Sequence, residues 1–205
     1  VADLFDASLL PANRPILNAL TLPSSLLITP RIKPGETEAF GPRLERALAN
    51  DKPGGVVLRV SDPALLESLA QLLAAARTRG KILILNSGDA APLPPGFHGL
   101  HLSAAAAFTL DARPDVDGWI GASVHRIEEA VHARRLGLDY VIAGSVRETP
   151  SHSGIEPLGW DGFAKIAAAA GIPTYAIGGV GLADVPRTHA SWGQGVAAIR
   201  AFWPG

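Results

Sequence analysis

We predict a (β/α)8 fold from this sequence: an eight-stranded, parallel TIM barrel of the α/β class, preceded by an N-terminal proline-rich arm. Eight short apolar runs alternate with segments whose apolar residues recur at helical spacing, the pattern of parallel strands joined by crossover helices. The chain has 205 residues, which suffices for one such barrel. The rival doubly wound sheet is disfavoured because residues 29–35, after the first strand, lack the G-x-G-x-x-G motif.

The N-terminal segment differs from the rest of the chain. Residues 1–23 contain Pro11, Pro15 and Pro23 and no sustained apolar period, and proline interrupts a continuous helix. We therefore expect an extended arm or linker over 1–23 and a single barrel over 24–205.

The predicted strands are short and apolar. They are residues 26–28, 55–58, 81–85, 99–102, 119–123, 140–143, 174–179 and 195–200. Helices are expected over 36–49, 63–79, 126–136 and 160–170, where apolar residues repeat every three or four positions. Asp62 and Pro63 are suited to begin the second helix, and Gly137 and Gly171 to end the last two. The glycine- and proline-rich stretch 87–96 leaves little room for a helix.

Composition excludes several classes of function. Hydrophobic residues make up 47% of the chain, yet no apolar run approaches the ~20 residues that span a bilayer. The net charge is −1 with scattered Lys and Arg, so we expect no nucleic-acid or membrane partner. The chain has no cysteine, which excludes disulfides, thiolate metal sites and a cysteine nucleophile. A soluble, cytoplasmic protein is expected, and homo-oligomerisation stays open.

The ends of the last two predicted strands indicate a phosphate site. In (β/α)8 barrels the loops after strands seven and eight often bind phosphate through backbone N–H groups. Glycine has no Cβ to hold an anion away from the backbone. The expected phosphate-binding residues are Gly178, Gly179, Ile199 and Arg200.

Polar residues at the other strand ends are candidates for substrate binding, because barrel active sites lie at the C-terminal ends of the strands. Arg59 in an apolar strand is costly to bury without an anionic partner, and Asn86 follows the same logic. Ser123 is either a ligand-binding residue or a helix N-cap. His101 is expected to be a hydrogen-bonded core residue. The polar loop 147–154 is either an ordinary surface loop or a lid with donors at Thr149, Ser151 and His152.

Eight motifs, in order, resemble the thiamine phosphate synthase/TenI family, whose members are small (β/α)8 barrels of thiamine biosynthesis. They are Leu-Leu-Ile-Thr at 26–29, Leu-Arg at 58–59, Gly-Leu-His-Leu at 99–102, Gly-Ala-Ser-Val-His at 121–125, Gly-Leu-Asp-Tyr at 137–140, the loop 144–151, Ala-Ile-Gly-Gly-Val at 176–180 and Gly-Val-Ala-Ala-Ile at 195–199. The resemblance covers roughly residues 26–202.

The sequence departs from the synthase pattern that this resemblance implies. The synthase joins a pyrimidine diphosphate to a thiazole phosphate, with Mg²⁺ on the diphosphate. Its pattern has Q-x-R-x-K at the second strand, Asn-Asp after the third and an aspartate shortly after the fourth. This chain has V-x-R-x-S at 57–61, Asn86-Ser87 and alanines at 104–106. His152 replaces the lysine of the Thr-Pro-x-Lys loop. We therefore expect no metal site, with Mg²⁺ bound only if synthase activity is retained through Asp89 or the substrate itself.

The TenI branch of the family, a thiazole tautomerase, does without the diphosphate machinery. The resemblance implies a catalytic histidine directly after the Ser-Val of strand five, which is His125 here. Aromatising a thiazole carboxylate phosphate removes a proton from one ring carbon and delivers one elsewhere. Histidine is suited to such proton transfer near neutral pH.

Three functions therefore stay open. The favoured one is a TenI-like tautomerase acting on a phosphorylated thiazole; the others are thiamine phosphate synthase and a non-catalytic domain that binds thiamine or thiazole phosphate. Residues 10–17 also resemble the linker of proteobacterial chains that fuse a Nudix hydrolase to a barrel of this family. A fused Nudix domain is accordingly a candidate partner.

Overall fold

Eight parallel strands close into a barrel, in a computed structural model that describes residues 22–32, 36–87, 92–149, 154 and 156–204. The strands follow one another in chain order around the barrel, and β1 pairs with β8 at Leu26 and Ala197 to close it. They are β1 (Ser25–Ile28), β2 (Gly55–Leu58), β3 (Ile82–Ser87), β4 (Gly99–Leu102), β5 (Trp119–Val124), β6 (Tyr140–Gly144), β7 (Thr174–Ile177) and β8 (Gly195–Ala198). The predicted fold class is confirmed.

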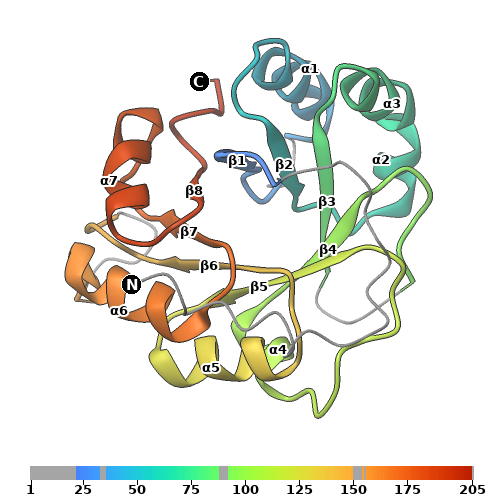
Figure 1. The fold of residues 1–205 in the computed structure, drawn as a ribbon. Helices are drawn as coiled ribbons and strands as arrows, with labels where there is room; N and C mark the ends of the chain where they lie inside the picture. The colour runs from blue at the N-terminus through green and yellow to red at the C-terminus, as the bar shows by residue number, and fades with distance from the viewer. Residues whose placement is uncertain (1–21, 33–35, 88–91, 150–153, 155, 205) are drawn as a thin grey trace.

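Helices surround the barrel (Figure 1). They are α1 (Thr37–Leu48), α2 (Pro63–Ser68), α3 (Ala70–Thr78), α4 (Ala104–Phe108), α5 (Ile127–Arg135), α6 (Gly159–Ala170), the 3-10 turn η3 (Leu182–Asp184) and α7 (Val185–Ala190). The helix predicted over 63–79 is divided at Leu69, which ends α2 and precedes α3. The short helices α4 and α7 were not predicted. Residues 92–98 form no helix, as their composition indicates.

The strands bury both faces. Alternate strand residues, among them Ile28, Val57, Ile84 and Ile142, form one cluster inside the barrel. Their neighbours in sequence pack outward against the helices in two larger clusters. The period of two along each strand therefore decides which side chains face the barrel axis.

The segment that follows β8 forms no helix in the described part of the chain. Residues 199–204 form turns, and Trp203 packs against Phe40 of α1 with ring centroids 5.1 Å apart. The described chain accordingly ends between α7 and α1 (Figure 1).

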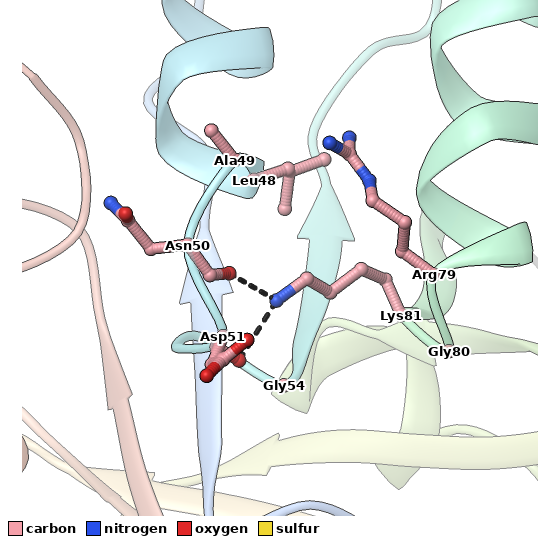
Figure 2. A pocket seen from close by; sticks show the side chains of 8 residues that line it. All are labelled: Leu48, Ala49, Asn50, Asp51, Gly54, Arg79, Gly80 and Lys81. Carbon is pink, nitrogen blue, oxygen red and sulfur yellow. Dashed lines mark hydrogen bonds between the residues drawn. The ribbon is translucent and has the colours of Figure 1, made fainter.

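A pocket at the N-terminal ends of the strands is the place where a buried lysine joins two loops. It lies where the chain leaves α1 and where α3 leads into β3 (Figure 2). The buried Lys81 ammonium donates to the carbonyls of Asn50, Asp51 and Pro53 at 2.5, 2.8 and 2.8 Å. Because all three ammonium protons have acceptors, Lys81 joins two loops at the end of the barrel away from the active-site face.

An ion pair holds β5 and β6 at the same end. Asp139, 6% exposed, accepts from Arg113 at 2.7 Å and from the Ile120 N–H at 2.8 Å. Arg113 also donates to the carbonyls of Gly137 and Gly118.

The start of the described chain is hydrogen-bonded to the barrel. The Tyr175 hydroxyl donates to the Pro23 carbonyl at 2.6 Å, and the Gln194 side chain to the Leu22 carbonyl at 2.8 Å. Residues 1–21 of the predicted arm lie outside the described residues, so its boundary stays a prediction. Among the described helices, none has the length and apolar character needed to cross a membrane.

Candidate functional site

Strand alternation brings four of the polar residues singled out from the sequence to the inner face of the barrel. Arg59 lies two residues beyond the inward Val57, and Asn86 two beyond the inward Ile84. Asn86 is also in register with His101 on the next strand. These three lie at the C-terminal ends of β2, β3 and β4, where barrel active sites are found.

Ser123 completes this inner ring through a contact with His101. Its hydroxyl oxygen lies 3.0 Å from His101 Nε2, while His101 Nδ1 lies 3.1 Å from the Tyr140 hydroxyl. The helix α5 begins only after Arg126, with no side-chain cap. The N-cap alternative for Ser123 is therefore wrong, and the expectation of a hydrogen-bonded core residue at His101 is confirmed.

Burial decides the protonation of His101. The side chain is 3% exposed, and burial, followed by the positive charge of Arg59, lowers its pKa to about 3. His101 is therefore neutral at physiological pH, and its imidazole carries one N–H.

Arg59 is a half-buried cation inside the mouth. Burial, and then the positive charge of Arg31, lower the pKa of its guanidinium. Its backbone N–H donates to the Thr29 hydroxyl at 2.8 Å, which fixes the end of β2 to the end of β1. No described residue forms an ion pair with its guanidinium. A half-buried guanidinium in this position suits an anionic ligand group.

His125 lies directly after β5 and is exposed. Its Nδ1 lies 2.7 Å from the Gly144 carbonyl at the end of β6. Its backbone N–H donates to the Glu129 carboxylate at 2.7 Å, and Arg126 donates to the same carboxylate. Burial raises the pKa of Glu129, but these hydrogen bonds outweigh it and the net shift is downward. The ionised Glu129 thus holds the backbone of His125 in place.

Of the three donors predicted in the loop after β6, only Thr149 lies in the described part of the chain. Thr149 is 8% exposed, and its hydroxyl has no hydrogen-bond partner in the described part of the chain. Ser151 and His152, the other two predicted donors, lie outside the described residues.

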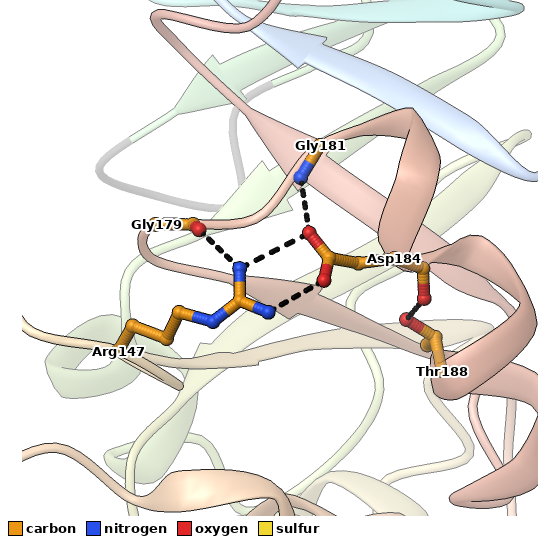
Figure 3. A network of polar contacts seen from close by, with 5 residues as sticks. All are labelled: Arg147, Gly179, Gly181, Asp184 and Thr188. Atoms are coloured by element: carbon orange, nitrogen blue, oxygen red, sulfur yellow. Dashed lines mark hydrogen bonds and ion pairs between the residues drawn. The ribbon is translucent and has the colours of Figure 1, made fainter.

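An ion pair that was not predicted joins this loop to the one after β7 (Figure 3). Arg147 donates to the Asp184 carboxylate at 2.6 and 3.2 Å and to the Gly179 carbonyl at 2.7 Å. Asp184 also accepts from the Gly181 N–H at 3.0 Å. The hydrogen bond from Arg147 lowers the pKa of Asp184, so the pair is ionised at neutral pH.

The predicted phosphate-binding glycines follow β7. Gly178 and Gly179 have φ values of +99° and +66°, which glycine adopts without strain. A Cβ at Gly178 would lie 2.6 Å from the Ser145 Cβ, so glycine is also required by the close approach of the β6 loop. The N–H groups of both glycines donate to no acceptor in the described ranges.

The other two predicted phosphate-binding residues follow β8. Ile199 is half-buried in the interior cluster, and its carbonyl accepts from Phe202 and Trp203. Arg200 is exposed. Anion binding by these four residues stays a prediction.

The described donors at the mouth do not fit Mg²⁺, the metal implied by a synthase. Mg²⁺ prefers carboxylates together with substrate phosphates. The ends of β3 and β4 present Asn86, Ser87 and Ser103, followed by Ala104. No group of three His, Asp or Glu side chains suited to a metal occurs among the described residues. Asp89 lies outside them.

Sequence reasoning assigned no individual role at the site to Tyr140, Arg147 or Asp184, although Arg147 begins the candidate loop 147–154. Tyr140 lies in an apolar strand, and its partner His101 is 39 residues away. Arg147 and Asp184 are 37 residues apart. The alternation of β6 could have placed Tyr140 inside the barrel, but no local signal indicated the other two.

Comparison with known proteins identifies relatives of the whole barrel. The family described as thiamine monophosphate synthase matches residues 26–202. A thiamine-phosphate synthase of Thermus thermophilus is 34% identical over 186 residues, covering 86% of this chain and 87% of that protein. The thiamine biosynthesis bifunctional protein ThiM/ThiE of Symbiobacterium thermophilum is 36% identical over 146 residues, which are 70% of this chain but 30% of that protein.

A solved structure supports the fold. The thiamine phosphate pyrophosphorylase from Pyrococcus furiosus superposes with a TM-score of 0.63 at 24% identity, covering 87% of this chain and 86% of that one. The family description and the Thermus thermophilus relative carry the name of the synthase, the alternative to the tautomerase favoured from the sequence. A fused Nudix domain is not shown by any of them.

Proposed function

Because the chain belongs to the thiamine monophosphate synthase family, we propose that it is an enzyme of thiamine biosynthesis that moves a proton on a phosphorylated thiazole, as a TenI-type tautomerase. One observation supports this most: the 2.7 Å contact between His125 Nδ1 and the Gly144 carbonyl. A carbonyl oxygen only accepts, so Nδ1 carries the proton of the neutral ring. Nε2 is then the basic nitrogen, available to a ligand.

The reaction needs no metal. Nε2 of His125 takes a proton from one ring carbon, and the resulting imidazolium returns a proton to a second position, so that one bond to hydrogen breaks and another forms. A histidine performs both halves near neutral pH. The described donors at the ends of β3 and β4, which do not fit Mg²⁺, agree with chemistry of this kind.

The ligand is proposed to lie across the mouth. Its phosphate would bind the N–H groups of Gly178 and Gly179, with Ile199 and Arg200 from the end of β8. Arg59, Asn86 and Ser123 would contact the thiazole and its carboxylate. Thr149, Ser151 and His152 would supply donors from the loop after β6.

Turnover of a thiazole carboxylate phosphate tests the proposal. We expect His125→Ala to lower kcat by ~10²–10⁴-fold, the usual contribution of one general acid–base, with affinity nearly unchanged. Arg59→Ala should instead weaken binding. The control is His189→Ala on α7, which removes an exposed histidine whose ring contacts the Gln194 carbonyl at 3.1 Å. Wild-type turnover in His125→Ala would refute the assignment, and an inactive parent protein that still binds the ligand would establish a binding domain.

The second candidate is thiamine-phosphate synthase, which the names of the relatives favour. It is distinguished by mass spectrometry after incubation with a pyrimidine diphosphate, a thiazole phosphate and Mg²⁺. We expect no coupled product, because neither family carboxylate is retained at its own position. Formation of thiamine phosphate would establish the synthase instead.

A further inference from the structure

A buried chain of three polar side chains crosses neighbouring strands inside the barrel. Tyr140 of β6 contacts His101 of β4, and His101 contacts Ser123 of β5, at 3.1 and 3.0 Å. The phenol of Tyr140 is 0% exposed and His101 is 3% exposed, whereas Ser123 is half-buried at the mouth. This chain of hydrogen-bonded side chains therefore begins in the core and ends where a ligand would bind.

The packing holds Tyr140 in one position. Its ring lies 5.6 Å from the His101 ring in a stacked arrangement and 5.9 Å from the Tyr175 ring in an edge-on one. Gly121 makes room for it, because a Cβ there would lie 2.1 Å from the Tyr140 Cζ. These contacts hold the phenol oxygen within reach of the His101 ring.

The need to pair every buried polar group decides which side chain donates and which accepts in these two hydrogen bonds. Burial raises the pKa of Tyr140 well above its usual value, so the phenol keeps its proton. Its only hydrogen-bond partner in the described ranges is His101 Nδ1. If Nδ1 carried the proton, the phenol O–H would be buried without an acceptor, which is costly. Tyr140 therefore donates to Nδ1, and Nε2–H donates to the Ser123 oxygen.

We infer that Tyr140 and His101 are positioning residues that make the Ser123 hydroxyl a hydrogen-bond donor toward the mouth, where it selects an anionic oxygen of the ligand together with Arg59. Ser123 already accepts from His101, so its own proton is directed elsewhere. The order of residues looks like a Ser–His triad, but the polarity is the reverse: His101 donates to Ser123 and cannot take its proton. This site is accordingly built for recognition and not for a serine nucleophile.

Nitrogen NMR of the free protein tests the direction of the two hydrogen bonds through the tautomer of His101. We expect His101 to show a protonated Nε2 and an unprotonated Nδ1, unchanged between pH 7.5 and pH 5. Tyr140→Phe should give a mixture of the two tautomers. The control is Tyr175→Phe, which removes a buried tyrosine hydroxyl that donates to Pro23 and not to His101. A protonated Nδ1 in the wild-type protein would overturn the inference, even if Tyr140→Phe does not fold.

A binding measurement tests whether the Ser123 hydroxyl selects an anionic oxygen of the ligand. The choice of probe in this experiment rests on the proposed function. The probes are a thiazole phosphate with and without a ring carboxylate. Ser123→Ala and Tyr140→Phe should each weaken binding of the carboxylated probe ~10–150-fold, the contribution of one hydrogen bond to a charged group, and leave the other probe within about twofold. Equal loss for both probes would refute the selection of an anionic oxygen. If neither probe binds the wild-type protein, the proposed function fails, while the nitrogen spectrum still decides the direction of the chain.

Discussion

Acid should destabilise this protein through His101 at a pH where most carboxylates are still ionised. The pKa of this histidine is about 3 in the folded barrel, against about 6.5 in an unfolded chain. Between these values the unfolded state binds more protons than the folded state. The free energy of unfolding therefore falls as the pH is lowered, beginning near pH 6.5.

The expected loss can be worked from the two pKa values. Lowering the pH from 7 to 5 protonates His101 in nearly all unfolded molecules but in almost no folded ones. This reduces the free energy of unfolding by about 2 kcal/mol. The cause is the burial of an imidazole at 3% exposure, with the nearby charge of Arg59 as a second cause.

Urea unfolding at pH 7 and pH 5 measures this loss. The matched variant is His101→Gln, which retains a side-chain N–H but cannot titrate. The two proteins have all other histidines in common. The free energy of unfolding of the wild-type protein should therefore fall by about 2 kcal/mol more than that of the variant between the two pH values. Equal losses in the two proteins would refute the argument that His101 is neutral and buried in the folded state.

Three further outcomes are expected. Asp139→Ala should lower the free energy of unfolding by about 3 kcal/mol, because Arg113 loses its carboxylate partner inside the barrel end; a loss below about 1 kcal/mol in urea unfolding would contradict this. Gly121→Ala should cost about 1–3 kcal/mol and change the near-UV circular dichroism, since its Cβ would displace the Tyr140 ring; an unchanged spectrum and midpoint would argue against the packing described. Calorimetry should detect no micromolar Mg²⁺ binding in the absence of a phosphate ligand, and such binding would show a metal site that the described residues do not form.

Local patterns were enough to predict the barrel. Each strand is a short apolar run, and each of the longer helices a segment of period 3.6, so the alternation is visible without any long-range contact. The same local rule placed Arg59 and Asn86 at strand ends. It was less reliable for the helices: Leu69 divides the one predicted over 63–79, and α4 and α7 were too short to recognise.

The family resemblance allowed two further predictions about the site, the catalytic role of His125 and the departures from the synthase pattern, because both depend on residue identity at known spacings. It did not decide between tautomerase and synthase, because the names of the relatives favour one and the residues of this chain favour the other.

The sequence by itself determined the number and order of the strands, the polar residues at their ends and the presence of a histidine after strand five. Only the tertiary structure decided which polar groups meet. Ser123 and Tyr140 contact His101 across 22 and 39 residues, and Arg147 meets Asp184 across 37. Such contacts arise because closing the barrel brings distant strands and loops together, and burial then decides the protonation of His101, which no local pattern can indicate.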